Sequence, residues 1–183
     1  SLEGGILADL KVRQDDIVEP GQILARLDPT LTESNVDETA AKYRAALASS
    51  ARLTAEVNGT SLSFPKELNG YSDLVASETR LYHSRRDSLA QSLRWLQEAL
   101  HQTRSELNIS ESLISVGAAS NVEVLRLRQK VADLELRRAD LQSQYMVAAR
   151  DELAKANADI ETLSATIKGR TDSLSRLIFR SPV

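Results

Sequence analysis

The chain has 183 residues, a formal net charge of −3 and no cysteine. So small a charge argues against a nucleic-acid partner, and the lack of cysteine excludes disulfides and thiol chemistry. The hydrophobic content of 42% includes only 4% aromatic residues, a balance that favours long helices with narrow apolar seams. No apolar run approaches the ~20 residues of a membrane span, and no signal peptide is visible. Because the chain starts and stops within a pattern, we expect it to be a piece of a longer protein.

Residues 5–28 predict three short strands separated by turns. The first contains Ile6, Leu10 and Val12, the second is Ile17-Val18, and the third contains Ile23, Leu24 and Leu27. Strands this short cannot close a core alone. The last residues, Leu177–Val183, read as a returning strand, so we expect them to join Gly5–Asp28 in one small sheet.

Three helices are expected between these strands, over about 30–58, 71–116 and 120–176. Thr30 and Glu33 have the spacing of a capping box, and Asn58-Gly59 ends the first helix. At 1.5 Å per residue the helices span roughly 43, 69 and 86 Å. These lengths predict that the first helix lies beside the start of the second, instead of stacking end to end on it.

The second and third helices carry a coiled-coil pattern. Seam positions from Val75 to Ile114 alternate spacings of four and three and are mainly apolar, with weak points at Thr79, Arg86, Thr103 and Ser110. The same spacing runs from Val124 to Tyr145, with Arg138 as its one charged position. After Tyr145 the phase of the pattern slips. We relate the slip to the expected overlap, because the third helix would there gain a second neighbour.

A stop and a start signal lie between these two helices. Gly117 can take the left-handed conformation that ends a helix, and Ser120 with Glu123 has the spacing of a capping box. The flanking helices must then run antiparallel. Their length indicates that this turn is the exposed end of a long hairpin.

No residue pattern predicts an active site. His83 and His101 lack further partners for a metal site and read as solvated or seam-edge residues. Asp15-Asp16 is typical of a turn and not of a catalytic acid pair. The pairs Arg85-Arg86 and Arg137-Arg138 are interpreted as solvent-exposed residues on helix faces. We therefore expect no catalytic, cofactor-binding or metal-binding residue, and a protein that is not an enzyme.

The opening segment resembles half of the biotinyl/lipoyl fold, and the whole layout resembles a family of secretion adaptors. The half-motif is carried by Gly5, Leu10, Val12, Asp16, Val18, Gly21, Gln22, Leu24 and Asp28. A half-motif, a helical excursion and a returning strand together are similar to the haemolysin D-like periplasmic adaptors, the membrane fusion proteins of type I secretion. The most specific other pieces are Glu3–Ile6, Phe64-Pro65 with Leu68, Leu74–Glu78, Gly117–Ser120 and Glu123–Leu127.

This resemblance implies a mainly α fold, in which a long antiparallel hairpin is inserted in a small lipoyl-like β half-domain. The implied divisions are residues 1–29 and 177–183 for the β part and 30–176 for the hairpin. It further implies a periplasmic location, in a parent protein anchored in the bacterial inner membrane. The implied partners are an inner-membrane ABC transporter, a TolC-type outer-membrane channel, a large secreted cargo such as an RTX toxin, protease or adhesin, and further copies in a ring such as a hexamer.

In related adaptors the tip of the hairpin meets the channel through an arginine, a leucine and a serine or threonine. Leu113 and Ser120 match the latter two, whereas Ile109 stands at the arginine position and Arg104 is a candidate substitute. The expected docking site consists of Leu113, Gly117, Ala118, Ala119, Ser120 and Asn121.

One other function is open to a chain of this pattern, and a further one is excluded. A coiled-coil scaffold with no transport role would need the helices alone, and would not need a sheet split open by them. A swinging-arm carrier would need a modifiable lysine in the hairpin turn of the lipoyl-like motif, where this chain has Asp28-Pro29-Thr30.

Overall fold

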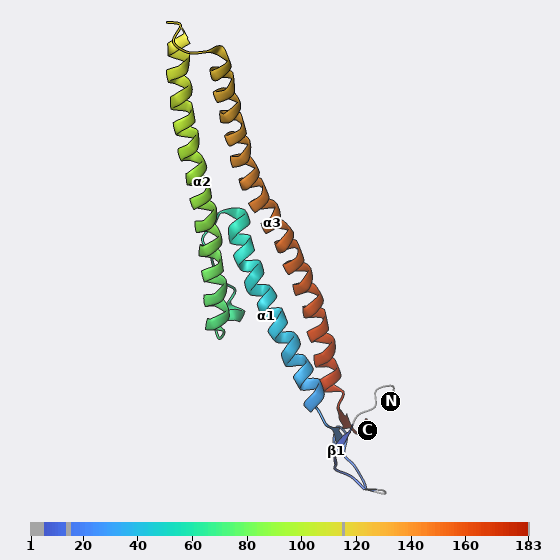
Figure 1. Ribbon diagram of the computed structural model, residues 1–183. Coiled ribbons are helices and arrows are strands. Elements are labelled where there is room, and N and C mark those ends of the chain that lie inside the picture. The colour runs from blue at the N-terminus through green and yellow to red at the C-terminus, as the bar shows by residue number, and fades with distance from the viewer. Residues whose placement is uncertain (1–5, 14–15, 115, 183) are drawn as a thin grey trace. The chain divides into compact units, whose positions relative to one another are not determined.

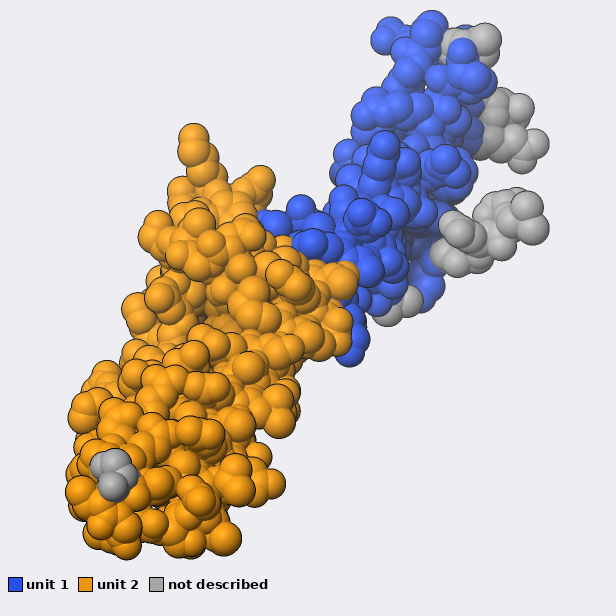
Figure 2. Space-filling view, turned by 90° about the horizontal axis from the view of Figure 1, so that it is seen from above, with its two compact units in different colours: residues 1–47, 155–183 blue, residues 48–154 orange. Residues whose placement is uncertain are grey.

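The computed structural model describes residues 6–13, 16–114 and 116–182. Its elements in chain order are strands β1 (Leu7–Leu10) and β2 (Ile23–Leu27), helix α1 (Thr30–Asn58), a 3-10 turn η1 (Lys66–Leu68), helices α2 (Ser72–Ile114) and α3 (Asn121–Ser175), and strand β3 (Ile178–Arg180) (Figure 1). The fold is mainly helical, as predicted, and each predicted helix boundary falls within two residues of the observed one. The chain divides into two compact units, residues 1–47 with 155–183 and residues 48–154 (Figure 2).

The first unit contains a three-stranded antiparallel sheet in the order β1-β2-β3. The predicted pairing of the first and last segments of the chain is therefore confirmed for the described residues. Ser181 extends it, since its amide donates to the Gln22 carbonyl at 2.9 Å. The strand expected at Ile17-Val18 is wrong: these residues have no regular secondary structure, and Val12 lies beyond the end of β1. The prediction was based on apolar composition, but the hydrogen bonds of a sheet form only where a partner strand lies alongside.

Asp28 caps the start of α1, which corrects the predicted capping box of Thr30 and Glu33. The Asp28 carboxylate accepts bonds from the Thr30 amide at 2.9 Å and from the Thr30 hydroxyl at 2.6 Å. These bonds lower the pKa of Asp28 below its ordinary value, since they favour the charged carboxylate. Further along, Arg170 of α3 donates to the Asn35 carbonyl and the Thr39 hydroxyl, both at 2.6 Å.

The second unit contains α2, the part of α3 up to Ala154 that pairs antiparallel with it, and the last turns of α1. Every predicted seam position of α2 except Arg86 is at least partly buried, and Leu100 is fully buried. Ion pairs connect Arg128 with Glu111, at 2.8 Å, and Arg104 with Glu135 across the pair. The coiled-coil seam predicted from the heptads is thus confirmed.

The end of α1 lies beside the start of α2, as the helix lengths predicted. Arg52 of α1 bonds Glu78 of α2, and the Tyr82 hydroxyl donates to the Thr60 carbonyl just after α1 at 2.9 Å. Ala149 of α3, which the heptad pattern did not single out, is fully buried at this level. Leu141, Tyr145 and Ala149 are each four residues apart, whereas the heptad pattern alternates spacings of four and three. An extra spacing of four locally unwinds the supercoil.

Candidate functional site

Gly117 ends α2 in a Schellman motif. Its φ of 69° lies in the left-handed region, where a glycine has no side chain to clash. The Ala118 amide donates to the Leu113 carbonyl at 2.9 Å, and the Gly117 amide donates to the Ile114 carbonyl at 3.0 Å. These two bonds define the motif. The glycine stop read from the sequence is therefore confirmed.

Ser120 caps the start of α3, although not as a capping box. Its hydroxyl accepts a bond from the Val122 amide at 3.2 Å, not from the Glu123 amide, which bonds the Ser120 carbonyl. The Glu123 carboxylate accepts from Arg126 at 2.7 Å. A carboxylate near a helix start also complements the macrodipole, so Glu123 can stabilise this end without reaching back to Ser120.

The turn connects two long antiparallel helices and carries exposed apolar side chains. Of the expected docking residues, Ala119 is partly buried, whereas Gly117, Ala118, Ser120 and Asn121 are exposed and Leu113 is 38% exposed. Around them lie four further apolar residues that are more than half exposed: Ile109, Val116, Val122 and Leu125. We call the six docking residues and these four apolar residues together the tip patch. Exposed apolar side chains gathered at one place are typical of an interaction surface.

Arg104, the candidate substitute for the family arginine, is engaged within the hairpin. Its guanidinium bonds Glu135 of α3. Ile109, at the family position itself, is 58% exposed within the tip patch.

His83 and His101 are both exposed on α2. Within residues 6–13, 16–114 and 116–182, no three acidic or histidine side chains are grouped so that they could hold a metal ion. In the same ranges, none of the helices is long and apolar enough to cross a membrane.

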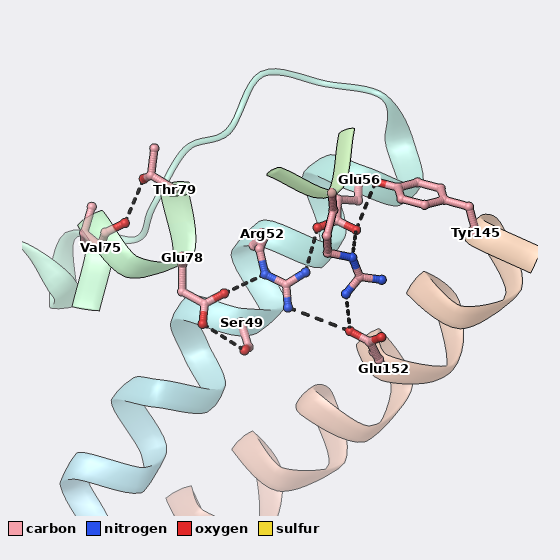
Figure 3. Close-up of polar contacts among 9 residues, drawn as sticks. Ser49, Arg52, Glu56, Val75, Glu78, Thr79, Tyr145 and Glu152 are labelled. Carbon is pink, nitrogen blue, oxygen red and sulfur yellow. Dashed lines mark hydrogen bonds and ion pairs between the residues drawn. The ribbon is translucent and has the colours of Figure 1, made fainter. Parts of the chain in front are cut away.

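A buried ionic cluster joins α1, α2 and α3 in the second unit (Figure 3). Arg52 of α1 has a side chain only 4% exposed and donates to Glu56 and to Glu78, at 2.6 Å each. Glu56, whose side chain is 0% exposed, also accepts from the Tyr145 hydroxyl at 3.1 Å and pairs with Arg85 at 3.4 Å. The ionic cluster consists of Arg52, Glu56, Glu78, Arg85, Tyr145 and Glu152.

Both arginines of the ionic cluster are held in the charged form. Burial lowers the pKa of Arg52, but its bonds to Glu78 and Glu56 outweigh that effect, so the pKa lies above the ordinary value. The hydrogen bond to Glu152, at 2.7 Å, raises the pKa of Arg85. Every fully buried side-chain polar atom in the described residues has a hydrogen-bond partner.

The interpretation of Arg85 as a solvated helix face is wrong. Its side chain is 24% exposed and is paired with Glu56 and Glu152 on two other helices. The neighbouring Arg86 stays exposed and bonds the Tyr82 hydroxyl. The only signal for the cluster in the sequence is the i, i+4 spacing of Arg52 and Glu56. That spacing is common on solvated helices, so it does not reveal burial.

The titration midpoint of the Tyr145 hydroxyl is expected to lie about two pH units above that of an ordinary tyrosine. Burial, the negative charge of Glu56 and the hydrogen bond to that carboxylate raise the pKa of Tyr145 from 10.0 to about 12. Because the folded-state pKa is the higher one, the resulting stability is fully present below pH ~10 and is lost as the pH rises through about 12. The difference in tyrosinate absorbance between the unaltered chain and Tyr145→Phe should show this midpoint. In urea the midpoint should return to ~10, and a midpoint of ~10 in the folded chain would rule out the contact.

Comparisons with known proteins find similarity to secretion proteins. The model of a family described as AprE, long alpha-helical hairpin, matches residues 32–116. The type I secretion system membrane fusion protein PrsE of Rhizobium meliloti (strain 1021) is 29% identical, over 100% of this chain and 53% of PrsE. The alkaline protease secretion protein AprE of Pseudomonas aeruginosa is 25% identical, over 98% of this chain and 53% of AprE.

Among solved structures, the soluble domain of LipC, a membrane fusion protein of a type I secretion system, has the same fold. Its TM-score is 0.62 at 23% identity, covering 98% of this chain and 86% of that chain. The chain spans about half the length of the curated relatives it matches. These matches confirm the resemblance to the secretion adaptors drawn from the sequence motifs.

Proposed function

Since this chain resembles the membrane fusion proteins of type I secretion along its whole length, we propose that it is part of a periplasmic adaptor subunit. The adaptor bridges an inner-membrane ABC exporter and a TolC-type outer-membrane channel. Its cargo is a large protein such as an RTX toxin, a protease or an adhesin. The parent protein is anchored in the inner membrane, acts without catalysing a reaction, and assembles from several copies.

One observation supports this proposal more than the others: a long hairpin is inserted between two neighbouring strands of one sheet. β2 leads into α1 and α3 leads into β3, and these two strands pair antiparallel in register Ile23 with Arg180. The hairpin therefore leaves and re-enters the sheet at adjacent strands. The turn between α2 and α3 carries the tip patch, which supplies an apolar surface for the channel.

The exposed apolar side chains of the sheet support the proposal that it is half of a lipoyl-like domain. Several of its apolar side chains are exposed, and Ile6, Leu7, Leu10 and Phe179 each exceed 40%. Strands this few do not bury an apolar face alone. We place residues 1–29 and 177–183 in one half of a lipoyl-like domain, which the other half covers, and residues 30–176 in the hairpin domain.

The alternative is a coiled-coil scaffold without a role in transport. Both functions use the helical pair, but only the adaptor has to span a fixed gap between two membrane complexes. The length of the hairpin should therefore matter for an adaptor and not for a scaffold.

A matched shortening of the hairpin tests this difference. Deleting one heptad from each helix, residues 93–99 and 138–144, keeps the seam in phase and lowers the tip by roughly 10 Å. Both deleted segments lie between the Arg85–Glu152 and Arg104–Glu135 pairs, so they occupy the same level of the hairpin. In a host lacking its own copy, we expect the unaltered whole protein to restore cargo in the medium and the shortened one to fail.

Two controls make the result interpretable. Circular dichroism should show that the shortened chain remains helical and unfolds cooperatively. Normal secretion by the shortened protein would refute bridging, and normal secretion without the gene would favour the scaffold.

A further inference from the structure

The part of α1 in the second unit carries mostly small side chains. Residues 48–51 read Ala-Ser-Ser-Ala, and Leu53 is the one large apolar side chain of residues 48–58 that is fully buried. Helices take their relative position from side-chain ridges that fit into grooves. Alanine and serine make shallow ridges. Apolar packing by itself therefore specifies weakly where this segment lies along its neighbours.

The ionic cluster, by contrast, has a single position at which its partners meet. Arg52 reaches Glu78 of α2, and Glu56 reaches both Arg85 of α2 and Tyr145 of α3. Their separations are between 2.6 and 3.4 Å. A slip of α1 by one helical turn, ~5.4 Å, would break every one of these contacts. It would leave charged groups buried without partners.

We propose that the ionic cluster fixes the axial position at which α1 ends on the pair of α2 and α3, and that it does so without stabilising the fold more than apolar side chains would. Two charges taken out of water lose hydration that their mutual attraction only partly restores. A buried polar group can nevertheless select one register, because every other register leaves it unpaired. The Tyr82 bond to the Thr60 carbonyl holds the turn after α1 at the same position.

This assignment gives the ionic cluster a geometric role in the second unit. The end of α1 at Asn58 marks where packing of three helices gives way to packing of two. Fixing that end also fixes the length of α2 and α3 that extends beyond α1 to Gly117. The cluster would thus define the free length of the two-helix part.

The test replaces the three partners on α1 and α2 together with apolar residues. In Arg52→Met/Glu56→Leu/Glu78→Met, Arg85 and Glu152 remain paired at 2.7 Å. Spin labels at Thr54→Cys and Ala76→Cys, both exposed positions, report the placement of α1 on α2. The chain has no native cysteine to compete for the label. The unaltered cluster should give one narrow distance distribution.

The triple variant should give a broadened distribution, or a second population displaced by about one turn, ~5 Å. Its denaturation midpoint should equal or exceed that of the unaltered chain. Glu56→Leu alone keeps the Arg52–Glu78 pair and should keep the single narrow distance. As a matched control, Glu38→Leu/Lys42→Met removes an exposed i, i+4 pair of the same helix and should leave the distribution unchanged.

Two outcomes would overturn the proposal. A triple variant with the same narrow distribution would mean that apolar packing alone sets the register. A triple variant that unfolds, or whose midpoint falls clearly, would mean that the cluster acts chiefly by stabilising the fold.

Discussion

Ser120→Arg in the whole protein is expected to abolish export of cargo while leaving the hairpin folded. Ser120 is exposed in the tip patch, so an arginine there places a long, charged side chain on the apolar surface proposed to meet the channel. The lost cap should cost roughly 0.5–2 kcal/mol, which a long hairpin can tolerate. Cargo in the medium, measured against cargo retained in the cells, reports the outcome.

The matched control places the same side chain elsewhere on the hairpin. Ser105→Arg lies on the exposed side of α2 and outside the tip patch, and it should leave export unchanged. Ser120→Ala measures the cost of the cap alone by urea denaturation of the 183-residue chain. Normal export by Ser120→Arg would show that the tip patch does not dock a partner.

Gly117→Pro acts on the same surface through the backbone. Proline fixes φ near −65° and lacks the amide that Gly117 donates to Ile114, so the Schellman motif cannot form. Gly59→Pro makes an equivalent change at the end of α1, where φ is 66°. Both should lose stability, but only the Gly117 variant should lose export. Normal export by Gly117→Pro combined with Ser120→Arg would contradict docking at the tip.

Arg52→Met alone is expected to destabilise the chain by about 3–5 kcal/mol. It removes the guanidinium but leaves the Glu56 and Glu78 carboxylates, whose side chains are 0% and 15% exposed. Glu78 then loses the guanidinium that it pairs with, and Glu56 keeps only Arg85 at 3.4 Å and the Tyr145 hydroxyl at 3.1 Å. A buried carboxylate that loses an ion pair keeps the cost of dehydration and loses the compensating attraction. Urea denaturation gives the free energy of unfolding, and an unchanged m-value would confirm that the same folded state is compared.

Lys42→Met is the matched control for this change. It removes a cation from an i, i+4 pair on the same helix, but both side chains are more than 60% exposed. Such pairs contribute roughly 0.3–0.5 kcal/mol. If Arg52→Met cost no more than Lys42→Met, the burial of the ionic cluster would be wrong. The single variant should lower the free energy of unfolding and the apolar triple variant should not, because only the single one leaves Glu56 and Glu78 in place without the Arg52 guanidinium.

Local signals were enough to predict the helices and the turn between them. The heptad seam from Val75 to Ile114 follows from apolar spacing, and the stop at Gly117 follows from the freedom of glycine at positive φ. The sequence predicted that Ser120 caps α3, but not that its hydroxyl accepts from the Val122 amide. A hydroxyl can reach either of two nearby amides, and the backbone geometry of the turn decides between them.

Contacts between distant segments were less accessible to the sequence. Ile17-Val18 has the composition of a strand, yet the described sheet contains only β1, β2 and β3, because a strand needs a neighbour to bond. Arg85 has the composition of a solvated face, yet two carboxylates on other helices pair with it. In both cases, composition does not say what lies alongside.

The sequence by itself determined the lengths of the helices, the seam between α2 and α3 and the stop at Gly117, because periodicity and backbone preference act over a few residues. Only the tertiary structure decided that Arg52 and Glu56 are buried and which groups they meet. Their partners Glu78, Arg85 and Glu152 lie 26 to 100 positions away in the chain, and they meet only when the end of α1 lies against α2 and α3. The spacing of Arg52 and Glu56 is the same on a buried helix and on a solvated one, so only the packing of the helices distinguishes them.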